Sequence, residues 1–287
     1  DSYRMGGGNG RTSKTAGTNH PGGVLTYFFL KDTSSVDTLA LSFKELDGSI
    51  IKTFSNYPDK KANEEKLEFK EGMNMFNWDM IYEDAKTFDG MILWWSKTSG
   101  PMASPGKYTV ELAVNGQTQS QQFELIKDPR SSATEADLRA QFDFLIEVRD
   151  KLSETHEAIT NIRKAKAKIN DVTKSLDSEE HKELLGKSKD VVKRMSAIEK
   201  ELYQTKNESR QDPLNFPVKL NNKLGHLAAL VSYGDNAPTK QDYEFKEEII
   251  AKIDIQLEEL YEIFNKEISE INQLIIENKI QLIELDE

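Results

Sequence analysis

The sequence predicts an α+β protein of two domains, an N-terminal antiparallel β-sandwich followed by an elongated antiparallel helical bundle. Three observations support this fold class. Between residues 24 and 130, short runs alternate apolar and polar side chains and are separated by turn dipeptides, as in antiparallel sheets. After Ser131, apolar residues recur every three or four positions, which is typical of amphipathic helices. With 287 residues, the chain is long enough to bury two cores.

Residues 1–23 are rich in Gly, Ser, Thr and Asn, and this composition predicts a linker or surface loop. The glycines do not have the spacing of a phosphate-binding loop, because Met5 stands five positions before Gly10 and Arg11 follows it. A dinucleotide-binding loop fails as well, since Arg11 occupies the position that needs Gly or Ala.

Residues 24–130 are predicted to form the sandwich. Asp47-Gly48 and Asn115-Gly116 are hairpin dipeptides, because Asn and Gly tolerate the positive φ that a two-residue turn requires. The stretch from Gly90 to Arg130 is expected to close the sheet as a hairpin. The expected strands are 24–30, 36–43, 50–54, 67–69, 73–80, 108–114 and 117–126.

Residues 131–287 are predicted to form the bundle, with helices at about 134–176, 178–206, 217–233 and 239–285. Thr134 with Asp137, and Thr239 with Asp242, have the spacing of capping boxes at helix starts. The bundle is therefore expected to contain three long helices and one short one.

The last helix has the clearest periodic pattern, and its apolar stripe averages a step of about 3.6 residues, which indicates a nearly straight helix. A helix of roughly 45 residues is about 65 Å long and cannot bury such a stripe alone. The first long helix is the expected antiparallel partner. The stripe consists of Ile249, Ile253, Leu257, Leu260, Phe264, Ile268, Ile271, Ile275, Asn278, Leu282 and Leu285.

Composition excludes several function classes. The formal net charge is −11, and no clustered Lys/Arg surface is apparent, so nucleic acid is not expected as a partner. The absence of cysteine excludes disulfides, Cys-zinc sites and thiol nucleophiles. No apolar run reaches the roughly 18 residues needed to span a bilayer. The chain begins at Asp1 without a signal peptide, and we expect it to be a piece of a longer protein.

No residue constellation identifies a reaction. His20, His156, His181 and His226 are scattered, without metal-ligand spacing, and His156 falls within an apolar helical stripe, where packing is the simpler interpretation. We therefore predict no catalytic residue, no metal and no cofactor. A pair of glycosidase carboxylates can come from anywhere in a sequence, so this alternative stays open.

The best candidates for ligand or interdomain contact are aromatic. Trp94 and Trp95 are adjacent, so in a strand they would point to opposite sides, one buried and one exposed. An exposed aromatic side chain stacks on a sugar ring or anchors a neighbouring domain. Tyr82 is the nearby aromatic residue that completes the candidate set, and packing against a loop or helix is the alternative interpretation.

Two ordered sets of motifs carry a family resemblance. Ser49-Ile50-Ile51-Lys52-Thr53-Phe54, then Gly72-x-Asn74-x-Phe76-x-Trp78-Asp79, then Pro105-Gly106-Lys107-Tyr108-Thr109-Val110, resemble the immunoglobulin-like module of flagellar hook-capping proteins. A longer string is similar to the C-terminal region of bacterial sortilin-type β-propeller proteins, usually labelled glycosyl hydrolases with BNR-like repeats. That string runs through Tyr3-Arg4, Trp78-Asp79, Met91-Ile92-Leu93-Trp94, Gly100-Pro101, Pro105 to Val110, Asn115-Gly116, Asp128-Pro129-Arg130, Gln141-Phe142-Asp143 and Arg149-Asp150-Lys151-Leu152.

The resemblance implies an immunoglobulin-like sandwich, a secreted or periplasmic location, and an upstream β-propeller that would hold any glycosidase site. No Asp-box repeat occurs here, so no catalytic residue is carried over. The leading hypothesis is a non-catalytic accessory module whose partner is that propeller. The alternatives are a carbohydrate-binding module using Trp94, Trp95 and Tyr82, and a helical module that binds a protein partner or oligomerises.

Overall fold

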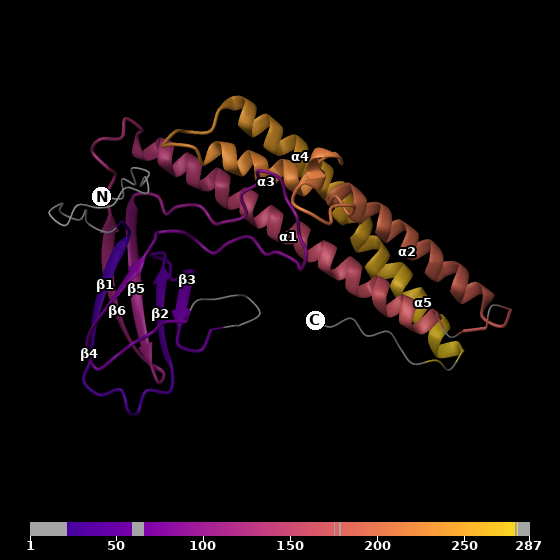
Figure 1. Cartoon of the computed structure of the whole chain (residues 1–287), viewed down its shortest axis with the longest axis horizontal. Coiled ribbons are helices and arrows are strands. Elements are labelled where there is room, and N and C mark those ends of the chain that lie inside the picture. The colour runs from indigo at the N-terminus through magenta and orange to yellow at the C-terminus, as the bar shows by residue number, and fades with distance from the viewer. Residues whose placement is uncertain (1–21, 59–65, 175, 178, 279, 281–287) are drawn as a thin grey trace. The chain divides into compact units, whose positions relative to one another are not determined.

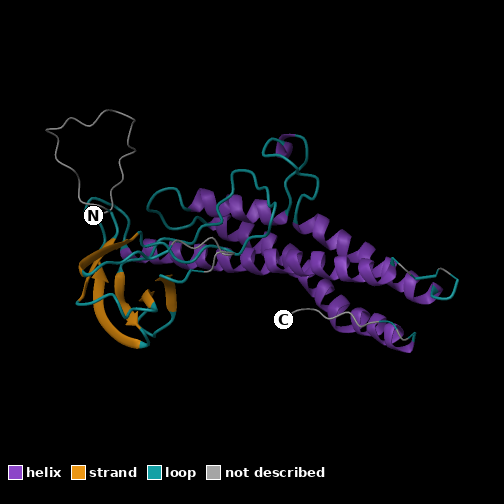
Figure 2. Cartoon of the chain, turned by 60° about the horizontal axis from the view of Figure 1, so that its bottom comes forward, coloured by secondary structure: helices purple, strands orange, loops and turns teal. Residues whose placement is uncertain are grey.

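A computed structural model describes residues 22–58, 66–174, 176–177, 179–278 and 280. Six antiparallel strands in two sheets are followed by packed helices, as the sequence predicted (Figures 1 and 2). The chain forms two compact units. The sheet unit contains the described residues up to Glu83, with Ser99–Phe142 and Asp235–Ala237; the helical unit contains Asp84–Thr98, Asp143–Gly234 and the residues from Pro238 onward.

The sheet unit contains one sheet of two strands and one of four. Strand β1 pairs with β4, and the larger sheet has the order β3-β2-β5-β6, with every pair antiparallel. The strands are β1 Val24–Leu30, β2 Leu39–Lys44, β3 Ile50–Ser55, β4 Gly72–Trp78, β5 Gly106–Val114 and β6 Gln117–Leu125.

The predicted hairpin turn at Asn115-Gly116 is present. Asn115 and Gly116 both have positive φ, 48° and 82°, and they join β5 to β6 with the two-residue connection that such angles permit. The Asn115 side chain adds a longer-range role, because its Oδ1 accepts hydrogen bonds from the backbone N–H groups of Asp37 and Thr38. The turn therefore also fixes the chain that enters β2.

Aromatic side chains from both sheets form the core of this unit. Phe43 of β2 stacks on Trp78 of β4 with ring centroids 4.4 Å apart, and Phe123 of β6 meets the edges of both rings. The Trp78 Nε1–H donates to the carbonyl of Ile81, so burial of the indole leaves no unsatisfied donor.

Two expectations for the sheet region are wrong. The expected strand at 67–69 is reduced to an isolated bridge between Ser55 and Lys66. Residues 90–98 contain no strand, and they belong to the helical unit rather than to the hairpin that closes the sheet. Sequence periodicity missed this because apolar residues in this stretch pack irregularly against helices instead of alternating along a strand.

The helices are α1 Glu135–Thr173, α2 Lys182–Leu202, α3 Leu220–Val231, α4 Lys240–Glu262 and α5 Ile268–Glu277, with a short 3₁₀ turn, η1, at Asp212–Leu214. Both predicted capping boxes are present. The Asp137 carboxylate accepts from the Thr134 N–H at 2.8 Å, and Thr239 with Asp242 makes the equivalent pair at the start of α4.

Ion pairs show how the long helices run. Lys187 and Arg194 of α2 pair with Glu270 and Glu259 respectively, so α2 is antiparallel to the α4–α5 segment. Along α1, Glu147 pairs with Lys246 and Lys151 with Asp254, so α1 runs parallel to α4. The expectation that the first long helix is the antiparallel partner of the last helix is therefore wrong, because that partner is α2.

The last helix is interrupted by a π-helical turn, η2, at Ile263–Glu267. Ile263 and Ile268 are both buried although they are five positions apart, a step that a regular α-helix cannot place on one face. The predicted stripe passed through Phe264, which only packs at the edge of the core. Its continuation through Leu282 and Leu285 lies outside the described residues.

Candidate functional site

The Asp84–Thr98 segment is an insertion between β4 and β5 that is bonded to the helical unit. The N–H of Lys86 donates to Ser153 Oγ of α1, and the N–H of Ile92 donates to the Tyr203 hydroxyl at the end of α2. The N–H of Lys97 donates to the carbonyl of Gly225 in α3 at 2.9 Å. A segment without regular secondary structure thus finds partners for its backbone on three helices.

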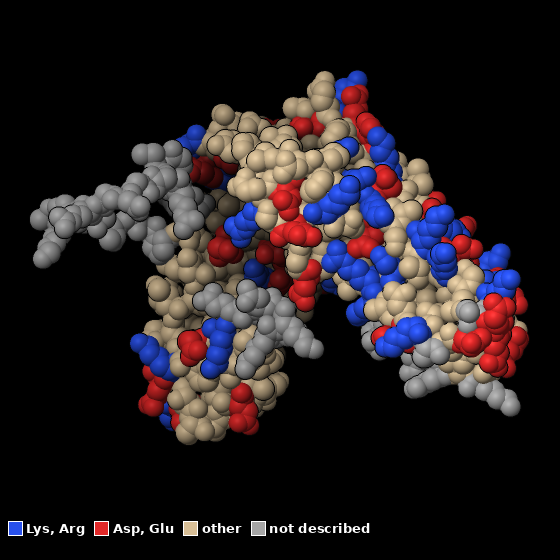
Figure 3. Space-filling model, turned by 45° about the vertical axis from the view of Figure 1, so that its right-hand side comes forward, with Lys and Arg blue, Asp and Glu red and all other residues tan. Residues whose placement is uncertain are grey.

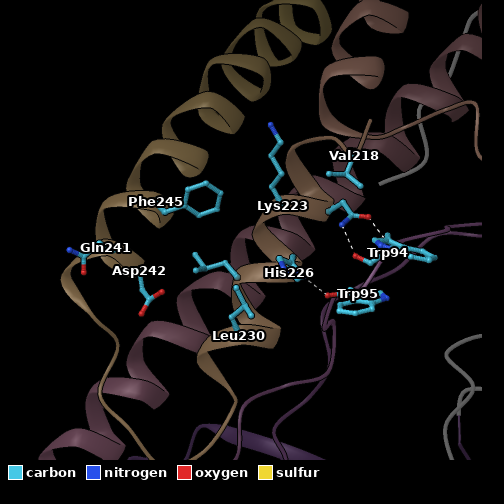
Figure 4. A pocket seen from close by; sticks show the side chains of 11 residues that line it. Trp94, Trp95, Val218, Lys223, His226, Leu230, Gln241, Asp242 and Phe245 are labelled. Atoms are coloured by element: carbon cyan, nitrogen blue, oxygen red, sulfur yellow. Dashed lines mark hydrogen bonds between the residues drawn. The ribbon is translucent and has the colours of Figure 1, made fainter. Parts of the chain in front are cut away.

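Asn222 on α3 holds the segment most specifically. Its Oδ1 accepts from the Trp94 N–H at 2.7 Å, and its Nδ2 donates to the Trp94 carbonyl at 2.9 Å (Figure 4). One buried amide therefore replaces the pairing that a neighbouring strand would give Trp94. Gly225, one turn later, allows the close approach, since a Cβ there would lie 3.0 Å from the Cβ of Ser96.

A groove of about 660 Å³ lies beside this anchor, between the Trp94–Trp95 corner, α3 and the first turns of α4 (Figure 4). We call it the Trp groove. Its apolar lining comes from Trp94, Trp95, Val218, Leu227, Leu230 and Phe245. Its polar lining comes from Asn222, Lys223, His226, Gln241 and Asp242.

Most polar groups of the Trp groove are already engaged by the protein. Asn222 is bonded to Trp94, and His226 Nδ1 is 2.8 Å from the carbonyl of Trp95. The Asp242 carboxylate accepts the N–H of Thr239 at 2.8 Å in the cap of α4. The groove therefore offers mainly apolar surface, with charge at its rim.

Trp94 and Trp95 do not take the opposite sides expected of strand residues. Trp95 has a positive φ of 49°, and the two indole rings stack with centroids 6.2 Å apart and an interplanar angle of 20°. Trp94 is half-buried, whereas 72 % of Trp95 is exposed. Both candidates thus line one surface, as a bend in the chain permits and a strand would not.

Tyr82, the third candidate, belongs to the sheet unit and is buried. Its hydroxyl donates to the Glu45 carboxylate, and its ring meets the edge of Phe142 with centroids 4.8 Å apart. Burial, reinforced by the Glu45 charge, raises the pKa of the Tyr82 phenol. Tyr82 is therefore a packed side chain within the sheet unit and not an exposed contact residue.

His156 is part of a buried polar cluster beneath the inserted segment. Its Nδ1 is 2.5 Å from the Lys86 carbonyl, and its Nε2 is 3.2 Å from Asn221 Nδ2. These partners assign the proton to Nδ1 and leave Nε2 as an acceptor. Burial lowers the pKa of His156, so the imidazole is neutral and joins α1, α3 and the segment.

A second surface, which sequence reasoning did not single out, lies on the outer face of the β1–β4 sheet. Tyr27 pairs with Met75, and Phe29 pairs with Met73, across the two strands. All four side chains are 58–65 % exposed, while Phe28 and Leu30 point inward. A signal was available, because a strand that reads Val-Leu-Thr-Tyr-Phe-Phe-Leu is apolar on both faces.

Charged side chains of both signs are interspersed on the face shown in Figure 3. Within the described residues, no group of three or more His, Asp or Glu is placed to hold a metal ion. No helix in that part of the chain combines the length and apolar character that crossing a membrane requires.

Among the described residues, the inserted segment, the Trp groove and the outer β1–β4 face are thus three candidate features for recognition. Each is built from backbone and side-chain contacts that lie within a single unit. In comparisons with known proteins, no family model matches this chain, and neither does any curated protein or solved structure.

Proposed function

We propose that the chain is a non-catalytic accessory module of a longer secreted protein, and that its sheet unit docks on a neighbouring domain of that protein. The outer face of the β1–β4 sheet carries this proposal. Strands covered on both faces read as continuous apolar runs, and β1 has such a sequence although the described part of the chain covers only its inner face.

The size of the patch favours a covalently linked neighbour over a free partner. Four large side chains at this exposure offer on the order of 500 Å². A stable complex between separate proteins buries about 800 Å² on each partner. Inter-domain contacts within one chain are smaller, at about 600–1,500 Å² in total, because the linker keeps the local concentration high. The motif resemblance supports a β-propeller as that neighbour.

Methionine footprinting tests the docking surface. Met73 and Met75 should react readily with a hydroxyl-radical or peroxide probe in the isolated 287-residue chain, and they should be protected in the intact secreted protein. Met102, which is 52 % exposed in the same unit, is the matched control and should react equally in both. Equal reactivity of Met73 and Met75 in the two samples would refute docking through this face.

A glycosidase assay tests the non-catalytic assignment separately. The isolated chain should not turn over aryl glycosides. Turnover that is abolished by substitution of a single Asp or Glu would place an active site within this chain and overturn the assignment.

A further inference from the structure

The Trp groove is an apolar surface with an open side. Trp95 of the inserted segment and Leu230 of α3 are well exposed, and Phe245 of α4 faces the same space (Figure 4). Large apolar side chains gathered around one concavity are typical of a binding site rather than of scattered surface residues. The groove does not belong to the β1–β4 face, so its role is independent of the proposed function.

The α3 wall of the Trp groove carries one formal positive charge, that of Lys223, although the chain as a whole is strongly acidic. Between Pro213 and Gly234 the sequence contains Lys219, Lys223 and His226 and no Asp or Glu, but Lys219 pairs with Glu201 and does not line the groove. Lys223 and His226 line the groove itself, whereas the Asp242 carboxylate on the opposite wall is turned onto the start of α4. The complementary occupant is therefore an apolar segment that carries negative charge.

The chain contains a segment of this chemistry outside the described residues. Residues 281–287 read Gln-Leu-Ile-Glu-Leu-Asp-Glu, with three large aliphatic and three acidic side chains and no basic one. Leu282, Ile283 and Leu285 supply the apolar groups, and the acids alternate with or follow them.

The segment cannot reach the groove of its own molecule. From Phe245 to Glu277 the chain runs through α4, the π turn and α5, which is about 48 Å at 1.5 Å per residue. From Asn278 to Leu285, eight residues span at most about 27 Å when fully extended. Occupation of the groove therefore requires the segment of another molecule.

We propose that the Trp groove binds residues 282–285 of a second copy of this chain. The aliphatic side chains pack against Trp95, Leu230 and Phe245, and the acidic ones face Lys223. The interface is heterologous, because the groove of one copy meets residues 282–285 of the next, so association proceeds head to tail.

Sedimentation of complementary variants tests this arrangement. The groove variant is Lys223→Glu with Leu230→Asp, two exposed positions whose substitution should not disturb folding. The segment variant is Leu282→Ser with Leu285→Ser. Wild-type chain should associate with increasing concentration, and either variant alone should lose at least about tenfold in affinity. Mixed in equal amounts, the two variants should form a heterodimer and nothing larger, because one intact groove meets one intact segment.

A peptide of residues 279–287 provides the direct binding probe. It should change the tryptophan fluorescence of the segment variant but not of the groove variant, and binding should weaken with salt. A control peptide with Lys in place of Glu284, Asp286 and Glu287 should not bind. The proposal is overturned if wild-type chain stays monomeric and the peptide is silent, or if the segment variant still self-associates. A fluorescence response to oligosaccharides but not to the peptide would instead make the groove a carbohydrate platform and would also overturn it.

Discussion

His156 has a structural role that its position in the sequence does not indicate. In the sequence it is one apolar-stripe position of a long helix; in the structure it is fully buried and bonded on both sides of its ring. A neutral imidazole satisfies the Lys86 carbonyl and the Asn221 amide at once, which no aliphatic residue of that size can do. The side chain therefore fastens the inserted segment to the bundle.

Stability should decrease as the pH falls below about 6.5, the ordinary pKa of His. Because burial lowers the pKa of His156 in the folded state, the unfolded chain binds more protons between the two pKa values. The free energy of unfolding should therefore fall by up to about 1.4 kcal/mol per pH unit in that window from this residue alone. Urea unfolding at several pH values measures this dependence.

The variant His156→Gln is the informative comparison, since Gln keeps one donor and one acceptor but does not titrate. It should be less stable at neutral pH and should show a smaller pH slope than the wild type. An unchanged slope in His156→Gln would contradict the assignment.

At the scale of elements, the π turn reconciles two apolar stripes that are out of phase. One buried stripe ends at Ile263 and the next begins at Ile268. These two residues are five positions apart, which is more than one turn of an α-helix. Arg194 of α2 spans the irregularity by pairing with Glu259 before it and Glu267 within it. The π turn thus follows from the sequence spacing together with the packing on α2.

Deleting Asn265, an exposed residue of the π turn, should convert the segment into regular α-helix with both stripes in phase. The free energy of unfolding should change by less than about 1 kcal/mol, because no buried side chain leaves the core. Chemical denaturation with circular dichroism measures both the stability and the helix content.

Deleting Glu258, an exposed residue of regular α4, is the matched control. Even if the π turn relaxes to absorb the shift, Leu260 and Ile263 rotate by about 100° away from the core. The cost should be about 3 kcal/mol or more from lost apolar burial. If the two deletions lower the free energy of unfolding equally, the π turn does not set the rotational phase of the two apolar stripes.

At the scale of the whole molecule, the two units interleave along the chain. The sequence predicts contiguous domains divided at Arg130, but Asp84–Thr98 lies in the helical unit although strands precede and follow it. Its apolar residues Ala85, Phe88 and Leu93 join the helical core. The helical core is thus completed by a piece of chain that composition alone assigns to the sheets.

Native-state hydrogen exchange should show directly that Asp84–Thr98 belongs to the helical unit. The amides of Trp94 and Lys97, which are bonded to Asn222 and Gly225, should exchange by the same opening event as α3. Amides of β2 and β5 should follow the opening of the sheet unit. If the Trp94 and Lys97 amides instead open with the strands as denaturant is added, the segment is not an integral part of the helical unit.

Local sequence patterns predicted most of the strands and helices, because alternation, turn residues and helix caps each depend on residues that are close together in the chain. Period-two alternation and the Asn115-Gly116 turn located β5 and β6, and capping boxes at Thr134 and Thr239 located the starts of α1 and α4. The candidate site was predicted only in part. Trp95 is exposed, but neither its stacking on Trp94 nor its groove has a local signal, because α3 and α4 supply the walls.

The sequence by itself determined the fold class, the approximate positions of most strands and helices and the absence of cysteine chemistry, since these depend on residue type and short-range periodicity. The tertiary structure alone decided the parallel course of α1 and α4, the π turn, the membership of Asp84–Thr98 and the burial of Tyr82. The physical reason is the range of the interactions. A turn or cap is stabilised by neighbours in sequence, whereas a groove is formed by side chains more than a hundred residues apart that meet only when the core excludes water.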